Sequence, residues 1–322
     1  MKKLIVLLVT AVSLTAQAEV NEIYLYPRYF HQPDKHILVQ NGRISEESQA
    51  IDKFEFLIRH MGEDAARNEV SWDASYYTGF QPTFDLSNYQ RGEFDAGPPV
   101  GSNAFQMQGY QVGCMINTWS FDWTPVTGGG PHCALQYRWD TALDTTPKPW
   151  STDDASLAFQ LSLKIPWHSK SGSNPHEAVA QSNMVIYLED KSGITLGIVV
   201  ALFDPRPSYQ EYVSHDTYTA FASAPLLEGQ SYITKSPYSF AYSSEPFSDP
   251  RFMRVHITRQ NLENIIHDAN ASGFLLDTAV NDYTLHSVLW LTEIGGYSST
   301  DNVSIGASIS HMLVLSCTGT QC

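Results

Sequence analysis

Several signatures that commonly identify an enzyme are missing from this chain. The sequence has no H-E-x-x-H zinc motif, no G-x-S-x-G nucleophile turn, no G-x-x-x-x-G-K-[ST] phosphate loop and no dinucleotide-binding fingerprint. The glycine-rich loop "TGGGPHC", Thr127 to Cys133, follows no apolar strand that leads into a helix. These absences weigh against metalloproteases, serine hydrolases and nucleotide-dependent enzymes, and we expect no cofactor.

Positive charge is also scarce. The 322 residues contain 19 Lys and Arg against 34 Asp and Glu, which gives a formal net charge of −15. Such a surface repels nucleic acid and anionic lipid, so a nucleic-acid partner is not expected. Because 43% of the residues are hydrophobic, the chain can bury a substantial core in one large domain or two smaller ones.

Long apolar runs are rare, and the main one is at the N-terminus. Lys2 and Lys3 precede an apolar run from Leu4 to Leu14, and "AQA" follows at 16–18. This is the pattern of a signal peptide, here residues 1–18, and the run is too short to span a bilayer. We therefore expect an exported protein, secreted or periplasmic, without membrane insertion.

Cysteines are few and all lie in the exported part, at Cys114, Cys133, Cys317 and Cys322. An even number in an oxidising compartment predicts disulfides, and the local pairing of the three possible ones joins Cys114 to Cys133 and Cys317 to Cys322. A C-x-x-C pair is missing, and His132 adjoins Cys133 instead of standing at ligand spacing. No metal site is therefore expected.

Alternating apolar residues dominate the second half of the chain. In "LAFQLSLKI", Leu157 to Ile165, every second residue is apolar, and "GITLGIVVALF", Gly193 to Phe203, is a β-branched run typical of a deeply buried strand. Similar patterns predict strands at 109–116, 134–139, 184–188, 252–257, 283–293 and 303–315. Clusters of Gly, Pro, Asn, Asp and Ser separate them, as in a β-sandwich.

One helix is predicted, in "TRQNLENIIHDANASG", with Thr258 as its N-cap and Gly273 as its stop. The end of this segment partly resembles a calcium loop, but Ala279 stands where that loop needs a bidentate Glu. We therefore predict an all-β fold with one short helix: a concanavalin-like, jelly-roll β-sandwich over 102–322. An irregular N-terminal extension or small subdomain at 19–101 precedes it, with a linker or long loop at 91–103.

Aromatic residues are concentrated in "NTWSFDW", where Trp119, Phe121 and Trp123 occupy every second position. In a strand, all three would project from one face and could form a platform for sugar rings. The alternative is that they belong to the sandwich core, which is the commoner place for such residues.

Two short motifs resemble those of the family-twelve glycoside hydrolases, which are endoglucanase and xyloglucanase jelly rolls. "NMVIYL", Asn183 to Leu188, resembles the family's nucleophile strand E-[IL]-M-I-W-L, and "LTEIGG", Leu291 to Gly296, is similar to its acid/base context. The resemblance implies that Glu293 is the acid/base residue and that Asn183, Tyr187 and the aromatic cluster contact a glycan.

The chain departs from that family at the nucleophile, because Asn183 stands where the family has Glu. An amide cannot form the covalent intermediate of a retaining mechanism. Glu189, Asp190 and Asp122 are candidate substitutes, although Glu189 and Asp190 also fit a hairpin turn before Gly193.

Three functions therefore remain open. The first is an exported protein that binds a polysaccharide or other glycan, and the second is a glycan-cleaving enzyme in which Glu293 acts with Glu189, Asp190 or Asp122. The third is an envelope structural or host-interaction protein, whose protein partner the sequence does not identify.

Overall fold

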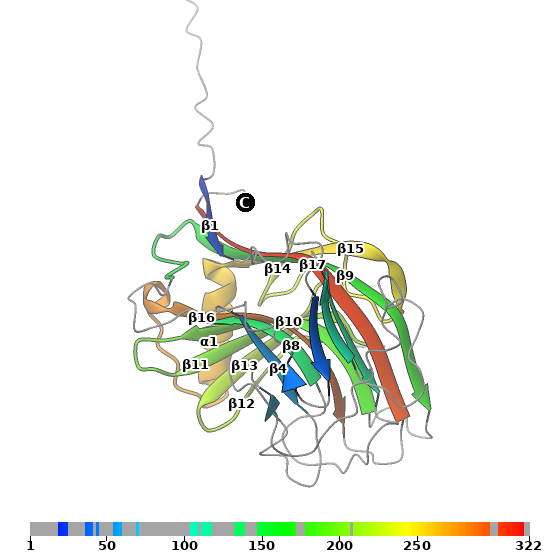
Figure 1. Cartoon of the computed structure of the whole chain (residues 1–322). Helices are drawn as coiled ribbons and strands as arrows, with labels where there is room; N and C mark the ends of the chain where they lie inside the picture. The colour runs from blue at the N-terminus through cyan, green and yellow to red at the C-terminus, as the bar shows by residue number, and fades with distance from the viewer. Residues whose placement is uncertain are drawn as a thin grey trace, which may run out of the picture.

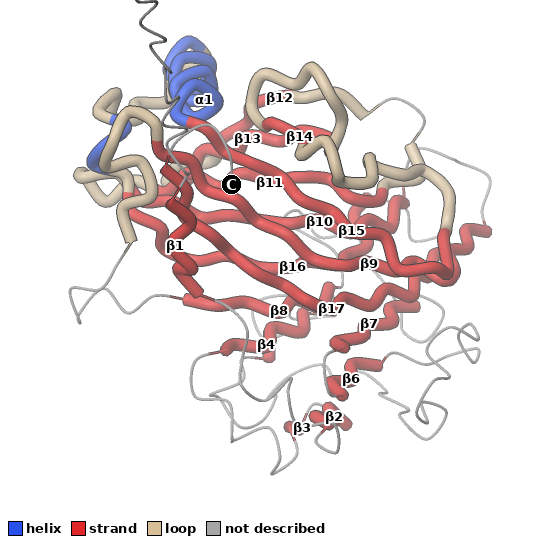
Figure 2. Tube along the Cα trace, turned by 90° about the horizontal axis from the view of Figure 1, so that it is seen from above, coloured by secondary structure: helices blue, strands red, loops and turns tan. Residues whose placement is uncertain are grey.

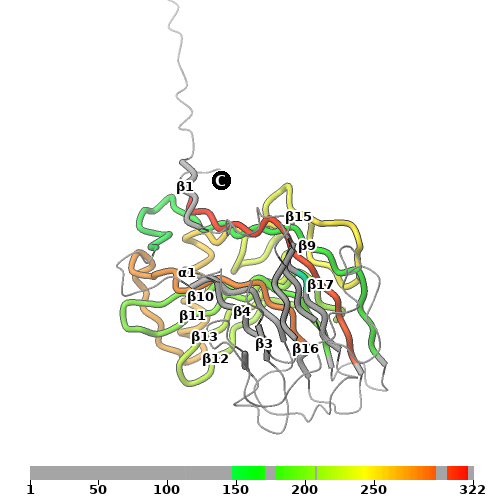
Figure 3. The backbone as a smooth tube through the Cα atoms, viewed as in Figure 1, coloured from blue at the N-terminus to red at the C-terminus, as the bar shows by residue number. Residues whose placement is uncertain are grey.

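The computed structural model describes residues 147–171, 178–206, 209–296 and 302–318, together with the backbone of the strands between 19 and 138. Within these residues the chain forms two β-sheets packed face to face, with one α-helix (Figures 1 and 3). The predicted all-β sandwich with one short helix is confirmed.

The first sheet has nine strands and the second has eight. In spatial order the first contains β14 (Thr234–Lys235), β15 (Phe247–Thr258), β9 (Ala155–Ser171), β17 (Asn302–Thr318), β7 (Gln111–Asn117), β6 (Ala104–Gln108), β2 (His36–Gln40) and β3 (Arg43–Ile44), with β1 (Glu19–Tyr24) beside β17. The second contains β12 (Tyr212–His215), β13 (Thr219–Pro225), β11 (Thr195–Phe203), β10 (Ala178–Glu189), β16 (Thr284–Gly296), β8 (His132–Arg138), β4 (Phe54–Arg59) and β5 (Glu69–Val70).

The core lies between the two sheets and follows from the alternation in the sequence. In β9, the alternate residues from Leu157 to Ile165 are fully buried, and Met184, Ile186 and Leu188 of β10 face them from the second sheet. Trp290 of β16 is also fully buried, and its indole N–H donates to Ser182 Oγ at 2.8 Å. Even-numbered residues of β10 therefore point into the core, and its odd-numbered residues point to the outer face of the second sheet.

Helix α1 (Arg259–Ala271) covers the sandwich edge where β12 and β13 of the second sheet approach β15 of the first (Figure 2). The predicted N-cap is confirmed: the Thr258 hydroxyl accepts from the N–H of Asn261, whose side chain accepts from the N–H of Thr258. The predicted stop at Gly273 is also confirmed, since this glycine has a φ of 98° that only glycine adopts readily. A 3₁₀ turn, η7 (Val280–Asp282), precedes β16.

Strands from both ends of the chain meet in the first sheet. β1 pairs with β17 along most of its length, with Glu19 opposite Thr318. β2 and β4, also from the predicted N-terminal extension, pair with β6 and β8 in the two different sheets. The boundary that we predicted near residue 101 stays a prediction.

Candidate functional site

The outer face of the second sheet is formed by alternate residues of β10 and its neighbours. In the register of the sheet, Gln181 lies opposite Glu293 of β16, Asn183 opposite Leu291, and Val185 opposite Leu289. The two residues that resemble the hydrolase motifs therefore lie on adjacent strands and project to the same side.

Three polar side chains, Gln181, Asn183 and Glu293, contact one another on this face; we call them the Glu293 cluster. Gln181 Nε2 donates to Glu293 Oε1 at 2.7 Å, and Asn183 Nδ2 donates to the same oxygen at 3.3 Å. Two amide groups from one strand thus converge on a single carboxyl oxygen from the next.

Asn183 is almost completely buried, with an exposed fraction of 1%. Its Oδ1 atom is also buried and accepts no hydrogen bond. Buried polar atoms in folded proteins nearly always have a partner. A hydroxyl-bearing ligand could supply the missing donor, provided that the groups covering this oxygen move aside.

A second pair of residues supports the cluster from the loop after β11. Arg206 Nη2 donates to Gln181 Oε1 at 3.3 Å, and the same guanidinium binds Asp204 through Nε and Nη2. The Asp204 side chain is fully buried, and it also accepts from the Arg206 N–H at 2.9 Å. Tyr242 donates its hydroxyl to the carbonyl oxygens of both residues. This network holds Gln181 in the orientation that bonds Glu293.

Burial raises the pKa of Glu293 above its usual value. The hydrogen bond from Gln181 and the positive charge of Arg206 act in the opposite direction, while the charge of Asp204 adds to the increase. The neutral carboxyl form is therefore more favoured than for an exposed glutamate. Such a group can donate a hydrogen bond or a proton to a bound oxygen atom.

The rest of this face is mainly apolar. Val185 and Leu289 are buried, and Tyr187, Val199 and Leu291 pack against them. The Tyr187 and Phe221 rings meet edge to face, with centroids 6.5 Å apart. Gly197, between them in the sheet, leaves room for this pair, because a Cβ atom there would lie 2.8 Å from Phe221 Cδ1.

Glu189 does not lie near Glu293. Gln181 is the residue paired with Glu293, and Glu189 lies eight residues further along β10, about 26 Å away at the usual rise of a strand. This separation corrects the prediction that Glu189 could be the catalytic partner, because paired carboxyl groups in glycosidases are about 5 to 9.5 Å apart.

Asp190 is the next residue in the chain and lies still further from Glu293, and its carboxylate accepts hydrogen bonds from backbone N–H groups. Its Oδ1 accepts from the N–H groups of Ser192 and Ile194, and its Oδ2 accepts from that of Asp277. These bonds close the β10–β11 turn, in which Gly193 has a φ of 79°. The alternative of a hairpin turn is therefore the correct one for Asp190, and its carboxylate is not a partner of Glu293.

Other predicted site residues fall outside the described part of the chain. They are Trp119, Phe121, Asp122 and Trp123. The aromatic platform and a role for Asp122 stay predictions.

The cysteines are only partly described. Cys317 is buried and disulfide-bonded, but no complete pair lies within the described residues, because the side chains of the other three cysteines fall outside them. The predicted pairings stay predictions.

Sequence reasoning missed Gln181, Asp204 and Arg206. Gln181 could have been found, since it lies two residues before Asn183 and alternation places both on one face. Asp204 and Arg206 lie at a strand end and in a loop, where no periodic pattern indicates which side chains they contact.

The described ranges show neither a metal-ligand cluster nor a membrane-spanning helix. They contain no group of three or more His, Cys, Asp or Glu that could hold a metal ion. In the same ranges no helix combines the length and apolar character needed to cross a membrane. In particular, Asp268 and Asn270 of the possible calcium loop bond Tyr232 and Leu276 instead.

Comparison with known proteins gives only distant structural likenesses. No protein-family model and no curated protein matches the chain. Among similar solved structures is the family 11 xylanase from Neocallimastix patriciarum, at 11% identity and a TM-score of 0.30, covering 67% of this chain and 87% of that one. The xyloglucanase domain of NopAA from Sinorhizobium fredii, in complex with cellobiose, gives 10% identity, coverage of 68% and 90%, and a TM-score of 0.33.

The endoglucanase cel12A from Rhodothermus marinus gives 8% identity, coverage of 66% and 86%, and a TM-score of 0.31. At such identities and TM-scores these likenesses carry no argument about activity.

Proposed function

We propose that this protein is an exported carbohydrate-binding β-sandwich that holds a glycan on the outer face of its second sheet. The observation that carries the proposal is the Glu293 cluster, with the unused acceptor of Asn183, beside the apolar surface around Val185 and Tyr187. Sugars present hydroxyl groups and apolar ring faces together, so a site for them needs both kinds of surface. The predicted signal peptide would deliver this site to an extracellular or cell-envelope glycan.

Binding is favoured over hydrolysis because Glu293 lacks a suitable partner among the described residues. Asp204 is the carboxylate that influences Glu293, but Arg206 engages both of its oxygen atoms. Residue 183, on the neighbouring strand, supplies an amide, which cannot act as a nucleophile.

Hydrolysis is the second candidate, and the raised pKa of Glu293 favours it. A carboxyl group that stays protonated to higher pH is suited to general acid catalysis. The second carboxylate would then have to come from the part of the chain outside the described residues, where Asp122 is the candidate from the sequence.

The test is to incubate the mature protein with plant, algal and bacterial polysaccharides and to measure retention and reducing-end release together. We expect retention without release. Asn183→Ala should weaken retention about tenfold, because it removes the side-chain amide that bonds Glu293 and carries the unused acceptor. Glu189→Gln is the matched control, since it changes a carboxylate on the same strand face far from the cluster, and it should retain glycan as the parent does.

Each other outcome has a definite meaning. Release of reducing ends that disappears in Glu293→Gln would refute the binding proposal and show that the protein is a hydrolase. The absence of both retention and release on every glycan would refute both glycan functions. The remaining function would then be that of an envelope interaction protein. Circular dichroism of every variant shows whether a loss arises from misfolding.

A further inference from the structure

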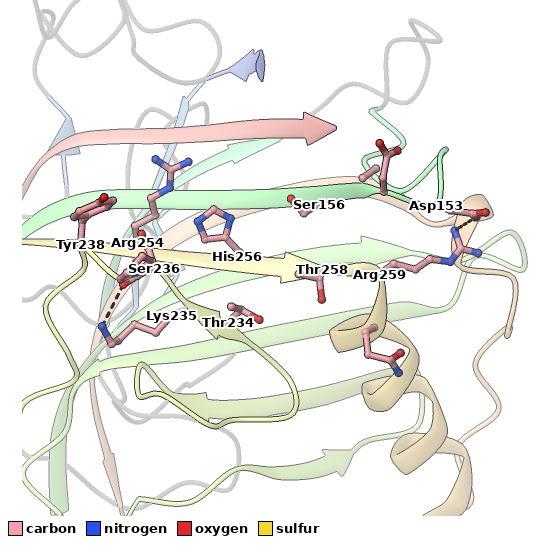
Figure 4. A pocket seen from close by; sticks show the side chains of 14 residues that line it. Asp153, Ser156, Thr234, Lys235, Ser236, Tyr238, Arg254, His256, Thr258 and Arg259 are labelled. Atoms are coloured by element: carbon pink, nitrogen blue, oxygen red, sulfur yellow. Dashed lines mark hydrogen bonds and ion pairs between the residues drawn. The ribbon is translucent and has the colours of Figure 1, made fainter. Parts of the chain in front are cut away.

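A pocket of about 730 Å³ lies on the outer face of the first sheet (Figure 4), whereas the Glu293 cluster lies on the second sheet. Its walls come from β14, β15, the start of β9 and the first turn of α1. Met253, Val255 and Ile257 of β15 are buried in the core, so Arg254 and His256 between them project outward into the pocket. The volume is in the range of small-molecule sites.

Arg254 has the most unusual environment in this pocket. Its Nε and Nη2 atoms are buried and have no hydrogen-bond partner. Burial lowers the pKa of its guanidinium, yet an arginine stays charged at neutral pH. A buried charged group without a partner is costly, and proteins rarely retain one without a ligand or counter-charge.

The same protein contains a partnered arginine for comparison. In Arg206, Nε and Nη2 are the two atoms that bind the carboxylate of Asp204 side-on. This paired geometry matches the two oxygens of a planar carboxylate. In Arg254, the same two atoms have no acceptor, so the carboxylate that Asp204 supplies in one place is missing in the other. Because both atoms are buried, a ligand carboxylate takes this position only when the groups that cover them move aside.

The neighbouring charges do not satisfy Arg254. Lys235 Nζ donates to the carbonyl oxygens of Ser236 and Ser239 and lies 3.5 Å from Glu228 Oε1. At the opposite end of the pocket, Asp153 is paired with Arg259 at 3.2 Å, away from Arg254 in Figure 4. Asp154 accepts from Thr152 Oγ1. The acidic lining residues are thus engaged elsewhere.

Two rings complete the Arg254 end of the pocket. His256 follows Arg254 by two residues on the same strand face, and its pKa is lowered to about 4 by burial and by the charge of Arg254. Its ring is therefore neutral at neutral pH and adds no competing charge. Tyr238 lies beside Arg254 in Figure 4, and 87% of its surface is exposed, so its ring is available to a ligand.

We propose that this pocket binds the carboxylate of an acidic sugar, with Arg254 holding both carboxylate oxygens through Nε and Nη2 and Tyr238 contacting the sugar ring. A carboxylate supplies the acceptors that Arg254 lacks, and an exposed tyrosine ring offers a surface for a pyranose. The site is independent of the glycan-binding proposal, because it is built from a different sheet.

The test is calorimetric titration of the whole protein at fixed ionic strength with sodium glucuronate, sodium acetate, glucose and sodium sulfate. We expect saturable binding of glucuronate, weaker binding of acetate and none of glucose. Arg254→Gln should weaken glucuronate binding at least tenfold, and Arg254→Lys should also weaken it, because lysine keeps the charge without the planar fork. Tyr238→Ala should weaken glucuronate binding and leave acetate binding unchanged.

Arg251→Gln is the matched control. Arg251 lies on the same strand with its guanidinium 4.0 Å from the centre of the Phe247 ring, and it does not line the pocket. This variant should bind glucuronate as the parent does.

In case the Arg254 variants do not fold, the parent protein labelled with ¹⁵N-arginine provides a direct readout, since glucuronate should shift the Nε–H signal of Arg254. Equal binding of acetate and glucuronate would assign the site to free carboxylates and overturn the sugar part of the proposal. Binding of sulfate in place of carboxylates, or no saturable binding, would overturn it entirely.

Discussion

Replacement of Arg206 by Met is expected to destabilise the fold through the buried carboxylate of Asp204. The side chain of Asp204 is fully buried, and Arg206 Nε lies 2.9 and 3.0 Å from its two oxygens. Loss of one partner of a buried pair costs about 3 to 5 kcal/mol, because an uncompensated charge remains. Since 43% of the Arg206 side chain is exposed, water can replace part of it, and we expect about 3 kcal/mol, the lower end of that range.

The assay is urea unfolding followed by tryptophan fluorescence, with a lower midpoint and an unchanged slope as the expected result. The double variant Asp204→Asn with Arg206→Met should recover most of the loss, because it removes the buried charge as well. Arg251→Met, whose guanidinium stacks on the Phe247 ring, is the control and should cost less. A loss below 1 kcal/mol for Arg206→Met, or a double variant as unstable as the single one, would refute the reasoning.

The same substitution should alter the Glu293 cluster. The positive charge of Arg206 lowers the pKa of Glu293, and burial raises it. Without Arg206 the pKa of Glu293 should rise further, which carboxyl-selective NMR can follow in the folded variant. An unchanged or lower value would show that Arg206 does not influence this carboxyl group.

Three further predictions concern stability. The pKa of His168 is lowered to about 4 by burial, with Lys170 adding to the effect and Asp204 opposing it. This histidine should therefore leave stability unchanged above pH 6.5 and contribute a loss of up to about 3 kcal/mol between pH 6.5 and 4. His168→Gln should remove this contribution in thermal melts, whereas the exposed-site control His215→Gln should not. Asp190→Ala should lower the free energy of unfolding in urea by about 3 kcal/mol, because three backbone N–H groups at 2.8, 2.9 and 3.1 Å lose their acceptor. A loss no greater than that of Glu189→Ala would contradict this role. Thr258→Ala should cost about 1 kcal/mol through loss of the helix cap, and Thr258→Ser should restore most of it; equal stability of all three proteins would mean that the cap contributes nothing.

Local patterns in the sequence were sufficient to predict the helix and the longer strands of the second half of the chain, but not the strands before residue 109 or the short strands β12, β13 and β14. The alternation from Leu157 to Ile165 predicts one buried face of β9, and these apolar residues are indeed buried. Thr258 and Gly273 mark the ends of α1 because capping and left-handed backbone are determined by neighbouring residues. Signals of this kind need no knowledge of the partner strand.

Strand partners could not be predicted, because they depend on contacts between distant residues. β11 pairs in parallel with β13 although the other neighbouring strands run antiparallel, and no pattern in either strand indicates this. Ala158 lies on the face of β9 opposite to Leu157 and Phe159, yet it is fully buried beside Leu315 and Cys317 of β17, which the alternation in β9 alone does not reveal.

The candidate site was predictable only in part for the same reason. Asn183 and Glu293 were singled out by short motifs, and the pairing of β10 with β16 brings them within hydrogen-bonding distance. Arg206 and Arg254 could not be distinguished from other arginines in the sequence. Their difference lies in whether a carboxylate occupies Nε and Nη2, which only the folded chain shows.

The pairing of β1 with β17 also has a consequence for the order of folding. During synthesis β1 emerges long before its partner β17, which spans Asn302 to Thr318. β9, on the other side of β17 in the sheet, also cannot pair with β17 until that strand has been made. Pairing across such separations closes long loops and is slow, so the first sheet can be completed only after β17 has left the ribosome.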